Sequence, residues 1–409
     1  MTPRLPFHTP GVDLHHLRVI TGAQGVAHAM RQIDPDVFPV YPITPQTPII
    51  QTLSQFVADG LCHTHVLDVE SEHSAMSAAV GAALAGARTM TATASQGLAL
   101  MVEVIYLAAS LRAPVVIAVG NRALSGPINI HGDHSDAMLA RDSGAIQIFA
   151  ETAEEAYDFT IIGTKLAEHK RILLPVMVGL DGFTITHSAE PVALLPDSAV
   201  KDFVGPYAYP SPLLGNQAGT YGPFSMPDSY FDLKYQEIEA VEAALEVFEL
   251  VAEEFFRLSG RRYQAVEAYR LEDAEAALVM MGSHSGTAKE VVDKMRDQGT
   301  RVGLVEIRLY RPFPRHAIEQ ALAQVPRVAV LDKASSPGTL PPLFLDVAAS
   351  VANTSKLVSV IYGLGGRDVP MAGLQDILEG VLADRFPQRE PGYLFGNKVW
   401  HKEGKSWPI

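Results

Sequence analysis

The first half of the chain alternates short apolar runs with helix-like segments, and this pattern limits the fold more than any other feature. Strand-like runs are expected at Val37–Val40, His65–Val69, Arg88–Ala94, Pro114–Val119, Ala145–Phe149 and Leu173–Val178. The segments between them, such as Ser74–Ala87 and Gly97–Leu111, are rich in small residues and read as helices. Continuous apolar strands separated by helices are typical of a parallel sheet covered on both faces. We therefore expect a doubly wound α/β domain.

The second half of the sequence predicts another, smaller α/β unit, which follows a segment of different composition. Prolines and glycines from Pro191 to Asp228 indicate an irregular linker or arm. An acidic helix is expected at Leu233–Leu258, with one buried stripe formed by Ile238, Val241, Leu245, Phe248, Ala252 and Phe255. Further strands are expected at Ala277–Met281, Val302–Ile307, Val328–Leu331 and Leu357–Ile361, and a helix near Leu374–Leu382. We divide the chain into a domain at 1–190, a linker with its helix at 191–265, and a domain with a C-terminal tail at 266–409.

Composition excludes several classes of protein. A net charge of −14 over 409 residues argues against nucleic acid and anionic membranes as partners, because both require a cationic surface. The single cysteine, Cys62, excludes an internal disulfide or a cysteine-ligated cluster made by this chain alone. The first residues lack the apolar core of a signal peptide, and Glu103 interrupts the most apolar run, which is too short to cross a bilayer. We expect a cytoplasmic protein.

Tyr41–Pro45 is a candidate ligand-binding loop. The segment follows a predicted strand, and its two prolines forbid helix and remove backbone donors. We expect a rigid, exposed loop that presents the hydroxyl of Thr44. In open parallel sheets, ligands bind at the carboxyl ends of the strands. Thr44 is therefore a candidate substrate contact.

Glu72 and Arg122 are the other candidates for chemistry. At the entry to a helix, Glu72 is either an ordinary N-terminal acid, worth roughly 0.3–1 kcal/mol through the helix dipole, or a carboxyl group in an apolar pocket with a raised pKa. Arg122 follows an apolar strand that ends in Gly120-Asn121. Its guanidinium is suited either to a bidentate carboxylate contact or to a surface salt bridge.

Other motifs carry weaker signals. His131-Gly132-Asp133-His134-Ser135-Asp136 and Cys62-His63-Thr64-His65 hold metal-ligating residue types, but without a geometry that points them at one ion. We assign no metal to this chain. The loop Gly282–Gly286 precedes a helix, and Gly363–Asp368 is similarly rich in glycine. Neither matches a phosphate-binding or dinucleotide motif, so an ordinary turn is the preferred interpretation.

An ordered set of motifs resembles one family. The set comprises Tyr41–Pro45, Ser71-Glu72, Ser95-Gln96-Gly97, Asn121-Arg122-Ala123, Gly132–Asp136, Arg141-Asp142, Asp181–Phe183, Tyr310–Pro314 and Gly363–Val369. From about residue 17 to 368 the chain resembles the alpha subunits of the pyruvate:ferredoxin oxidoreductase family, which are thiamine-diphosphate-dependent 2-oxoacid:ferredoxin oxidoreductases. The resemblance implies a pyrimidine-binding domain followed by a transketolase C-terminal-like domain.

The resemblance also implies roles for these residues. Glu72 would contact the aminopyrimidine of thiamine diphosphate, with Ser95, Gln96 and Gly97 nearby. Arg122 would bind the substrate carboxylate, and Thr44 would hydrogen-bond the substrate near its reacting carbonyl. The reaction would be oxidative decarboxylation of pyruvate with coenzyme A to acetyl-CoA and CO2, with electrons passed to ferredoxin.

Part of the required machinery is missing from the sequence. It contains no Gly-Asp-Gly motif for Mg2+ and diphosphate and no Cys-x-x-Cys. The resemblance implies a beta subunit that carries the diphosphate-binding half and a cluster, further gamma and delta subunits or their equivalents, and ferredoxin. This chain would be catalytically incomplete alone. Asn121–Ser125 favours pyruvate, while 2-oxoglutarate, a branched-chain 2-oxoacid and a non-catalytic scaffold remain as alternatives.

Overall fold

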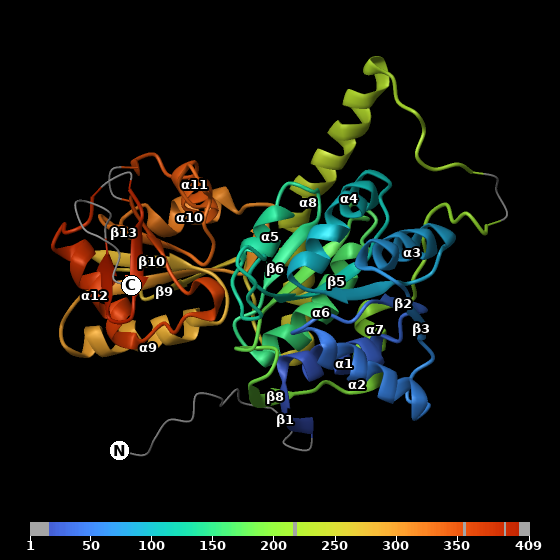
Figure 1. The fold of residues 1–409 in the computed structure, drawn as a ribbon, viewed down its shortest axis with the longest axis horizontal. Helices are drawn as coiled ribbons and strands as arrows, with labels where there is room; N and C mark the ends of the chain where they lie inside the picture. The colour runs from blue at the N-terminus through green and yellow to red at the C-terminus, as the bar shows by residue number, and fades with distance from the viewer. Residues whose placement is uncertain (1–15, 216–218, 355–356, 388–389, 401–409) are drawn as a thin grey trace.

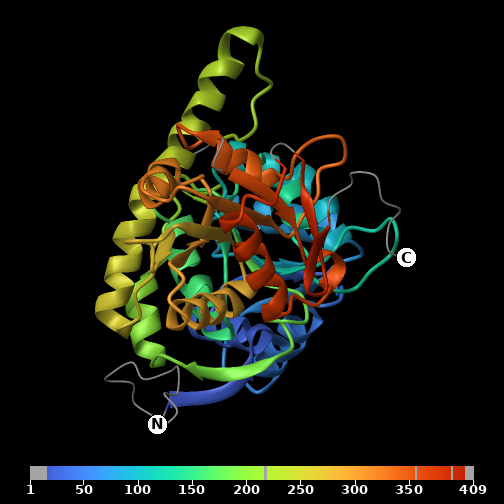
Figure 2. The same ribbon diagram turned by 90° about the vertical axis from the view of Figure 1, so that its left-hand side faces the viewer.

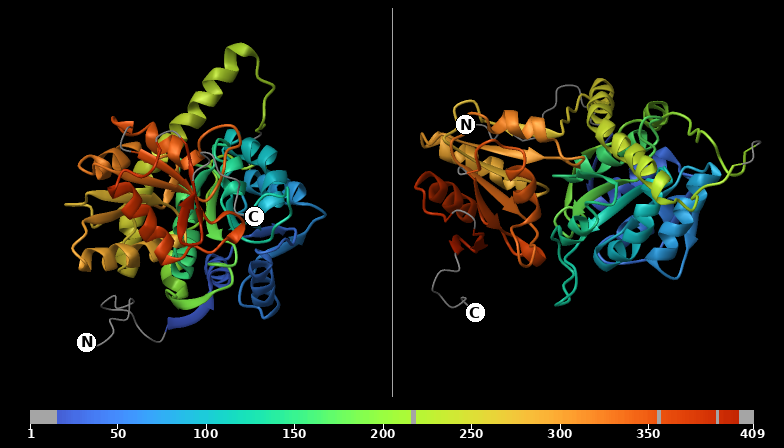
Figure 3. Two further views of the ribbon diagram at one scale, coloured as in Figure 1. Left: turned by 60° about the vertical axis from the view of Figure 1, so that its left-hand side comes forward. Right: turned by 90° about the horizontal axis from the view of Figure 1, so that it is seen from above.

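A computed structural model describes residues 16–215, 219–354, 357–387 and 390–400. Two α/β units lie side by side, and a long helix, α8, runs along the first and projects beyond it (Figure 1). The first unit comprises the elements from β1 to α8, and the second comprises those from β9 to β16. Viewed from above, α8 crosses the first unit on the side that borders the second (Figure 3).

The first unit is built on parallel strands. These are β2 (Val37–Val40), β3 (His65–Asp68), β4 (Met90–Thr93), β5 (Val116–Asn121), β6 (Ile146–Phe149) and β7 (Val176–Asp181). The order β6-β7-β5-β4 is continued by the pair β2-β3, because a parallel bridge joins Val37 to Thr89. All of these neighbours run parallel. The expected parallel sheet is confirmed, and each predicted strand lies within a few residues of an observed one.

Helices cover both faces of this sheet. They are α1 (Gly22–Ile33), α2 (Thr47–Ala58), α3 (Glu72–Ala85), α4 (Ser95–Ser110), α5 (Ser135–Leu139), α6 (Ala153–Ala167), α7 (Asp197–Val204) and α8 (Pro227–Ser259). In β5, Val116 and Ala118 pack into the core shared with α1, α6 and α8, whereas Ile117 and Val119 pack into the core shared with α3 and α4. Successive side chains of a strand point to opposite faces, so the unit is doubly wound.

The proline-rich segment is more regular than we expected. Residues 189–204 form β8 (Ala189–Ala193), which pairs antiparallel with β1 (Leu17–Thr21), and then helix α7. The irregular stretch therefore begins near Gly205. Helix α8 is longer than predicted, and its first turns leave the body of the molecule (Figure 2).

The predicted stripe of α8 is correct only in its second half. Phe248, Ala252 and Phe255 are buried, but Ile238 is 51% exposed and Val241 and Leu245 are only partly covered. The buried face is instead formed by Glu237, Ala240, Ala244, Val247, Phe248, Val251, Ala252 and Phe255. The reason is that the helix meets the body of the protein only from about Glu237 onward, and the stripe is rotated by one residue.

The second unit has a mostly parallel sheet of its own. Its strands are β9 (Val266–Tyr269), β10 (Ala276–Met280), β11 (Val302–Ile307), β13 (Val328–Asp332), β14 (Leu357–Ile361), β15 (Gly392–Phe395) and β16 (Lys398–Trp400), in the order β16-β15-β14-β13-β10-β11-β9. The helices are α9 (His284–Asp297), α10 (Arg315–Leu322), α11 (Pro342–Ala348) and α12 (Met371–Leu382), with a 3-10 turn η3 at Leu364–Gly366. Edge strands β9 and β16 run antiparallel to their neighbours.

One strand of the second half joins the sheet of the first unit. β12 (Leu309–Arg311) pairs antiparallel with β6, so that the first sheet has the order β12-β6-β7-β5-β4. The two units are therefore connected by backbone hydrogen bonds as well as by side chains. Among the described residues, no helix combines the length and the apolar character needed to cross a membrane.

Candidate active site

The candidate residues lie at the carboxyl ends of four adjacent strands. Thr44 follows β2, Glu72 follows β3, Ser95 follows β4 and Arg122 follows β5. In the order β3-β2-β4-β5, these strand ends form one edge of the sheet. Because ligands of open α/β sheets bind at this edge, the fold brings the predicted residues to the expected place.

The Tyr41–Pro45 loop is held by its own polar groups. The Gln46 amide donates to the carbonyl of Tyr41 at 3.0 Å, and the Gln46 backbone N–H donates to the carbonyl of Ile43 at 3.0 Å. Thr44 is exposed, as expected, whereas Pro45 is buried against the strand end at Gly120. The loop is thus half anchored in the protein, and it presents Thr44 to the outside.

Arg122 is buried beside this loop without an anionic partner. The residue is only 8% exposed. Its Nε donates a hydrogen bond to the carbonyl of Asn129 at 2.8 Å, and its Nη1 donates to the carbonyl of Thr44 at 2.9 Å. Within the described residues, Nη2 has no hydrogen-bond acceptor, and no carboxylate forms an ion pair with the guanidinium. A buried charge without a counter-charge is costly, so this arrangement favours an anion as ligand.

Asp136 holds the surrounding backbone in place. Its carboxylate is fully buried and accepts hydrogen bonds from the backbone N–H groups of Ser95 and Arg122, both at 2.9 Å, and from the side-chain amide of Asn121 at 3.0 Å. Burial raises the pKa of Asp136 to about 6, against the opposing effect of these donors. Ser95 adopts a positive φ of 48° at this contact. Asp136 therefore joins the first turn of α4 to the end of β5.

Glu72 lies in a tight contact between α3 and α4. Ser71 caps α3 by accepting a hydrogen bond from the Ser74 N–H, and Glu72, at the first position, is 4% exposed. Burial raises the pKa of its carboxyl group. A Cβ added to Gly97 of α4 would lie 2.5 Å from Glu72 Oε1 and 2.5 Å from Thr93 Oγ1. The environment is that of a desolvated carboxyl group rather than of a solvated helix-end acid.

An unsatisfied hydroxyl accompanies this carboxyl group. Thr93 Oγ1 is buried and has no hydrogen-bond partner within the described part of the chain. Buried polar groups are almost always paired, so an unpaired hydroxyl beside a protonatable carboxyl group makes this place a candidate contact for a polar ligand. An aminopyrimidine, with adjacent ring and exocyclic nitrogens, has the donor and acceptor groups that this set would satisfy.

The metal-like motifs have other partners. His134 Nε2 lies 2.7 Å from Asp181 Oδ1, Asp133 accepts from the N–H groups of Ser135 and Gly365, and Asp136 is engaged as described above. His63 pairs with Asp34, and Cys62 is a buried free thiol. Within the described ranges, one other cluster has metal-ligating groups: Glu151, Glu155 and Glu306.

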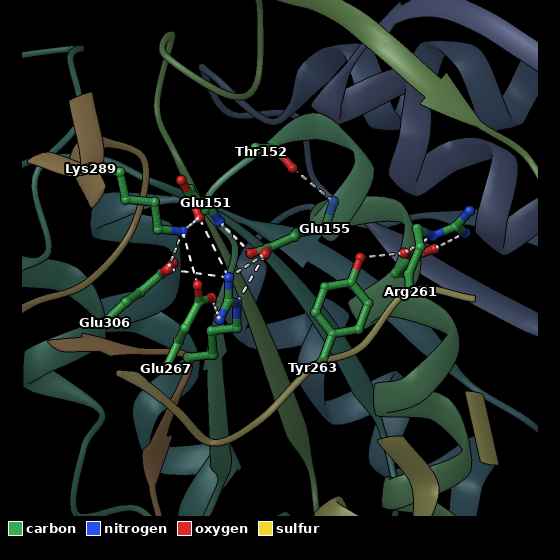
Figure 4. A network of polar contacts seen from close by, with 10 residues as sticks. Glu151, Thr152, Glu155, Arg261, Tyr263, Glu267, Lys289 and Glu306 are labelled. Atoms are coloured by element: carbon green, nitrogen blue, oxygen red, sulfur yellow. Dashed lines mark hydrogen bonds and ion pairs between the residues drawn. The ribbon is translucent and has the colours of Figure 1, made fainter. Parts of the chain in front are cut away.

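At the junction of the two units, that acidic cluster is paired with two cationic side chains of the protein. Lys289 Nζ lies 2.7 Å from Glu151 and 2.9 Å from Glu306 (Figure 4). Arg308 Nε donates to Glu155 Oε1 at 2.9 Å. The carboxylates of the cluster are therefore already engaged in ion pairs with side chains of the protein.

The glycine loop before α9 likewise meets a carboxylate of the protein itself. The Ser283 N–H donates to Asp181 Oδ2 at 3.0 Å, and Lys333 Nζ lies 3.0 Å from the same oxygen. The Gly282–Gly286 loop of the second unit therefore forms a hydrogen-bonded contact with the first unit. The sequence had not identified Asp136 or Asp181 as organising residues, because their partners are brought together only by the fold.

Comparisons with known proteins identify relatives over nearly the whole chain. Residues 28–253 match the family model "Pyruvate flavodoxin/ferredoxin oxidoreductase, thiamine diP-bdg", and residues 274–374 match "Pyruvate:ferredoxin oxidoreductase core domain II". The chain is 52% identical to pyruvate synthase subunit PorA of Thermotoga maritima, covering 92% of this chain and 97% of that protein. It is 45% identical to PorA of Methanocaldococcus jannaschii, covering 89% and 95%.

A solved structure has the same fold. The 2-oxoglutarate:ferredoxin oxidoreductase from Magnetococcus marinus, with 2-oxoglutarate, coenzyme A and succinyl-CoA bound, superposes with a TM-score of 0.73 at 20% identity. The match covers 90% of this chain, which spans 65% of that longer chain. At this level of identity, the likeness concerns the fold alone.

Proposed function

Because the chain belongs to the pyruvate flavodoxin/ferredoxin oxidoreductase family, we propose that it is the alpha subunit of a pyruvate synthase. The enzyme oxidatively decarboxylates pyruvate with coenzyme A to acetyl-CoA and CO2 and passes the electrons to ferredoxin, and the reaction is reversible. The observation that carries this proposal is the similarity to PorA over nearly the full length of both chains. A pyrimidine-binding domain at 1–190 and a transketolase C-terminal-like domain at 266–409 are part of the proposal.

We place the aminopyrimidine of thiamine diphosphate beside the contact between α3 and α4, where Glu72 and Thr93 lie. We assign Glu72 to the aminopyrimidine ring, where a carboxyl group with a raised pKa can hold a proton toward a ring nitrogen. Gly97 lies against Glu72, and Thr93 Oγ1 supplies a hydroxyl group without a partner in the described part of the chain. We also assign Ser95 and Gln96, which precede Gly97 in the first turn of α4, to the cofactor. When bound, the cofactor supplies the electron sink needed to break the bond between the carboxylate and the carbonyl carbon of a 2-oxoacid.

Arg122 and Thr44 are assigned to the substrate. The guanidinium is held by two carbonyl groups and has Nη2 to spare, so it can bind the carboxylate of pyruvate. The Thr44 hydroxyl lies on the rigid loop whose carbonyl anchors the same guanidinium, which places it to hydrogen-bond the substrate near its 2-oxo group. Burial of Arg122 strengthens its contact with an anion.

The remaining machinery is assigned to partner chains. The sequence has one cysteine and no Gly-Asp-Gly motif. Mg2+ and the diphosphate are therefore assigned to a beta subunit that also carries an iron–sulfur cluster. Gamma and delta subunits or their equivalents, and ferredoxin, complete the electron path. The complex is assigned to the cytoplasm.

The assembled complex tests these assignments. Its activity with pyruvate, 2-oxoglutarate and a branched-chain 2-oxoacid, in the presence of coenzyme A and a low-potential acceptor, identifies the substrate. Glu72→Gln should lower kcat by about 10²–10⁴-fold, the usual contribution of a positioned acid or base. Glu70→Gln, two residues away and exposed, should leave kcat within about twofold. Unchanged turnover in the Glu72 variant contradicts its assignment, and a preference for another 2-oxoacid corrects the substrate.

A further inference from the structure

In the described part of the chain, Asn129 joins the second unit to the proposed carboxylate-binding arginine. The backbone carbonyl of Asn129 accepts the Nε–H of Arg122 at 2.8 Å. The side-chain amide of the same residue donates to the carbonyl of Gly365, in the η3 turn, at 3.0 Å. Asn129 Oδ1 accepts the N–H of His131 at 2.6 Å. One asparagine therefore connects the guanidinium, its own loop and the second unit.

The turn at Gly363–Gly366 is shaped for this contact. The three glycines of this turn have a positive φ: 62° at Gly363, 59° at Gly365 and 75° at Gly366. Residues other than glycine rarely adopt this backbone conformation. A Cβ on Gly365 would collide with Asn129 Nδ2, and a Cβ on Gly366 would collide with the Cβ of His131. Glycine is needed here for both conformation and space, because the side chains of Asn129 and His131 lie directly against the turn.

Two further hydrogen bonds hold the same loop against the second unit. The Gly365 N–H donates to Asp133 Oδ2 at 3.1 Å, and the His134 N–H donates to the carbonyl of Lys333 at 2.8 Å. Between Arg122 and Asn129, by contrast, residues 125–128 are exposed. The segment is also tied to the first unit, because the Ala123 N–H donates to the carbonyl of His131 at 3.0 Å. The Asn129 carbonyl is thus held between this bond and the contact with Gly365, rather than by packing of the exposed loop tip.

We propose that Asn129 and Gly365 are positioning residues for the carboxylate of the 2-oxoacid, and that the second unit thereby takes part in substrate recognition. The proposal rests on the assignment of Arg122 to the substrate carboxylate. Two fixed carbonyl groups, of Thr44 and Asn129, hold two edges of the guanidinium. If the Asn129 carbonyl moves, the remaining Nη2 turns away from the line along which the carboxylate must approach, because the guanidinium is planar and rigid.

The test uses the assembled complex with Asn129→Ala and Gly365→Ala, and with Ile128→Ala as control. Ile128 is 79% exposed and adjacent to Asn129, so its removal alters the same loop without touching the contact. We expect both variants to raise the KM for pyruvate and the inhibition constant of oxamate about tenfold, in parallel, as befits the loss of one hydrogen bond. kcat should stay within about threefold, the KM for coenzyme A should not change, and Ile128→Ala should resemble the parent.

A double-variant cycle separates positioning from general damage. Arg122→Lys should raise the KM for pyruvate strongly, and adding Asn129→Ala to it should change that KM by less than about twofold, since both substitutions remove the same interaction. An additive effect overturns the proposal. So does an unchanged KM in Asn129→Ala, or in Asn129→Asp if the alanine variant does not assemble. If Arg122→Lys itself leaves the KM unchanged, the assignment of Arg122 to the substrate fails instead.

Discussion

Replacing Gly97 by alanine should inactivate the enzyme while leaving it folded. In an ordinary helix, alanine stabilises relative to glycine by roughly 0.5–1 kcal/mol. At Gly97, however, the new Cβ would lie 2.5 Å from both Glu72 Oε1 and Thr93 Oγ1 and 2.8 Å from Glu72 Cγ, where ordinary contacts begin at 3.4 Å. The Glu72 carboxyl group must therefore move by about 1 Å or rotate away.

The expected magnitudes follow from this displacement. Overpacking of a tight site costs about 1–3 kcal/mol, which the helix preference of alanine partly offsets, so the free energy of unfolding should fall only modestly. A displacement of about 1 Å at a reacting group costs on the order of 10²-fold in rate. We expect kcat with pyruvate to fall by about that factor, with a lower content of bound thiamine diphosphate in the purified complex.

The matched control is Gly81→Ala in α3. A Cβ at Gly81 meets nothing within 4 Å, so this variant should keep full turnover and gain the helix preference of alanine. Turnover, cofactor content and thermal unfolding of the three complexes decide the question. If Gly97→Ala keeps more than half of the parental turnover, the carboxyl group of Glu72 is not required where the structure has it.

Three further predictions concern stability. Asp136→Asn should change the pH dependence of unfolding. Burial favours the protonated carboxyl group of Asp136 and raises its pKa in the folded chain to about 6, from the ordinary value of 3.8. The contribution of Asp136 to the free energy of unfolding therefore falls as the pH rises from about 4 to 6. Urea unfolding of parent and variant should therefore show a difference that shifts in favour of the variant over that window, and a constant difference would contradict the assignment. Lys333→Met leaves Asp181 buried without its main cation, and urea unfolding should show that it lowers the free energy of unfolding by about 3–5 kcal/mol. The control Lys201→Met, at the surface, should leave the free energy of unfolding nearly unchanged. Phe248→Ala in α8 should cost about 3–5 kcal/mol because the ring is fully buried, whereas Leu250→Ala, 59% exposed, should cost less than about 0.5 kcal/mol; equal losses would mean that the buried face of α8 is assigned wrongly.

The local pattern was sufficient to predict β2 to β7 of the first unit and β10, β11, β13 and β14 of the second, most of which are apolar and buried, but it did not predict β9, β12, β15 or β16. It also predicted which residues lie at strand ends, and so brought Thr44, Glu72 and Arg122 to one edge of the sheet. Their roles remain proposals.

Residues defined by distant partners could not be predicted in this way. Asp136 occurs in a segment that resembles a metal-ligand set, but its carboxylate binds N–H groups at positions 95 and 122, which only the fold brings close. β12 has three residues, too few for a period to appear, and its partner β6 lies some 160 residues earlier. The rotated stripe of α8 has the same origin, since the sequence does not say where a helix first meets the body of the protein.

The insertion of β12 into the first sheet determines how the polypeptide can be divided. A fragment that ends before Val266 would contain every candidate residue of the active site, yet β6 would become an edge strand with a free row of N–H and C=O groups. Such an edge invites pairing with another molecule and aggregation. Expression of the isolated N-terminal half should therefore give insoluble material, and a soluble fragment requires that the chain continue at least through Arg311.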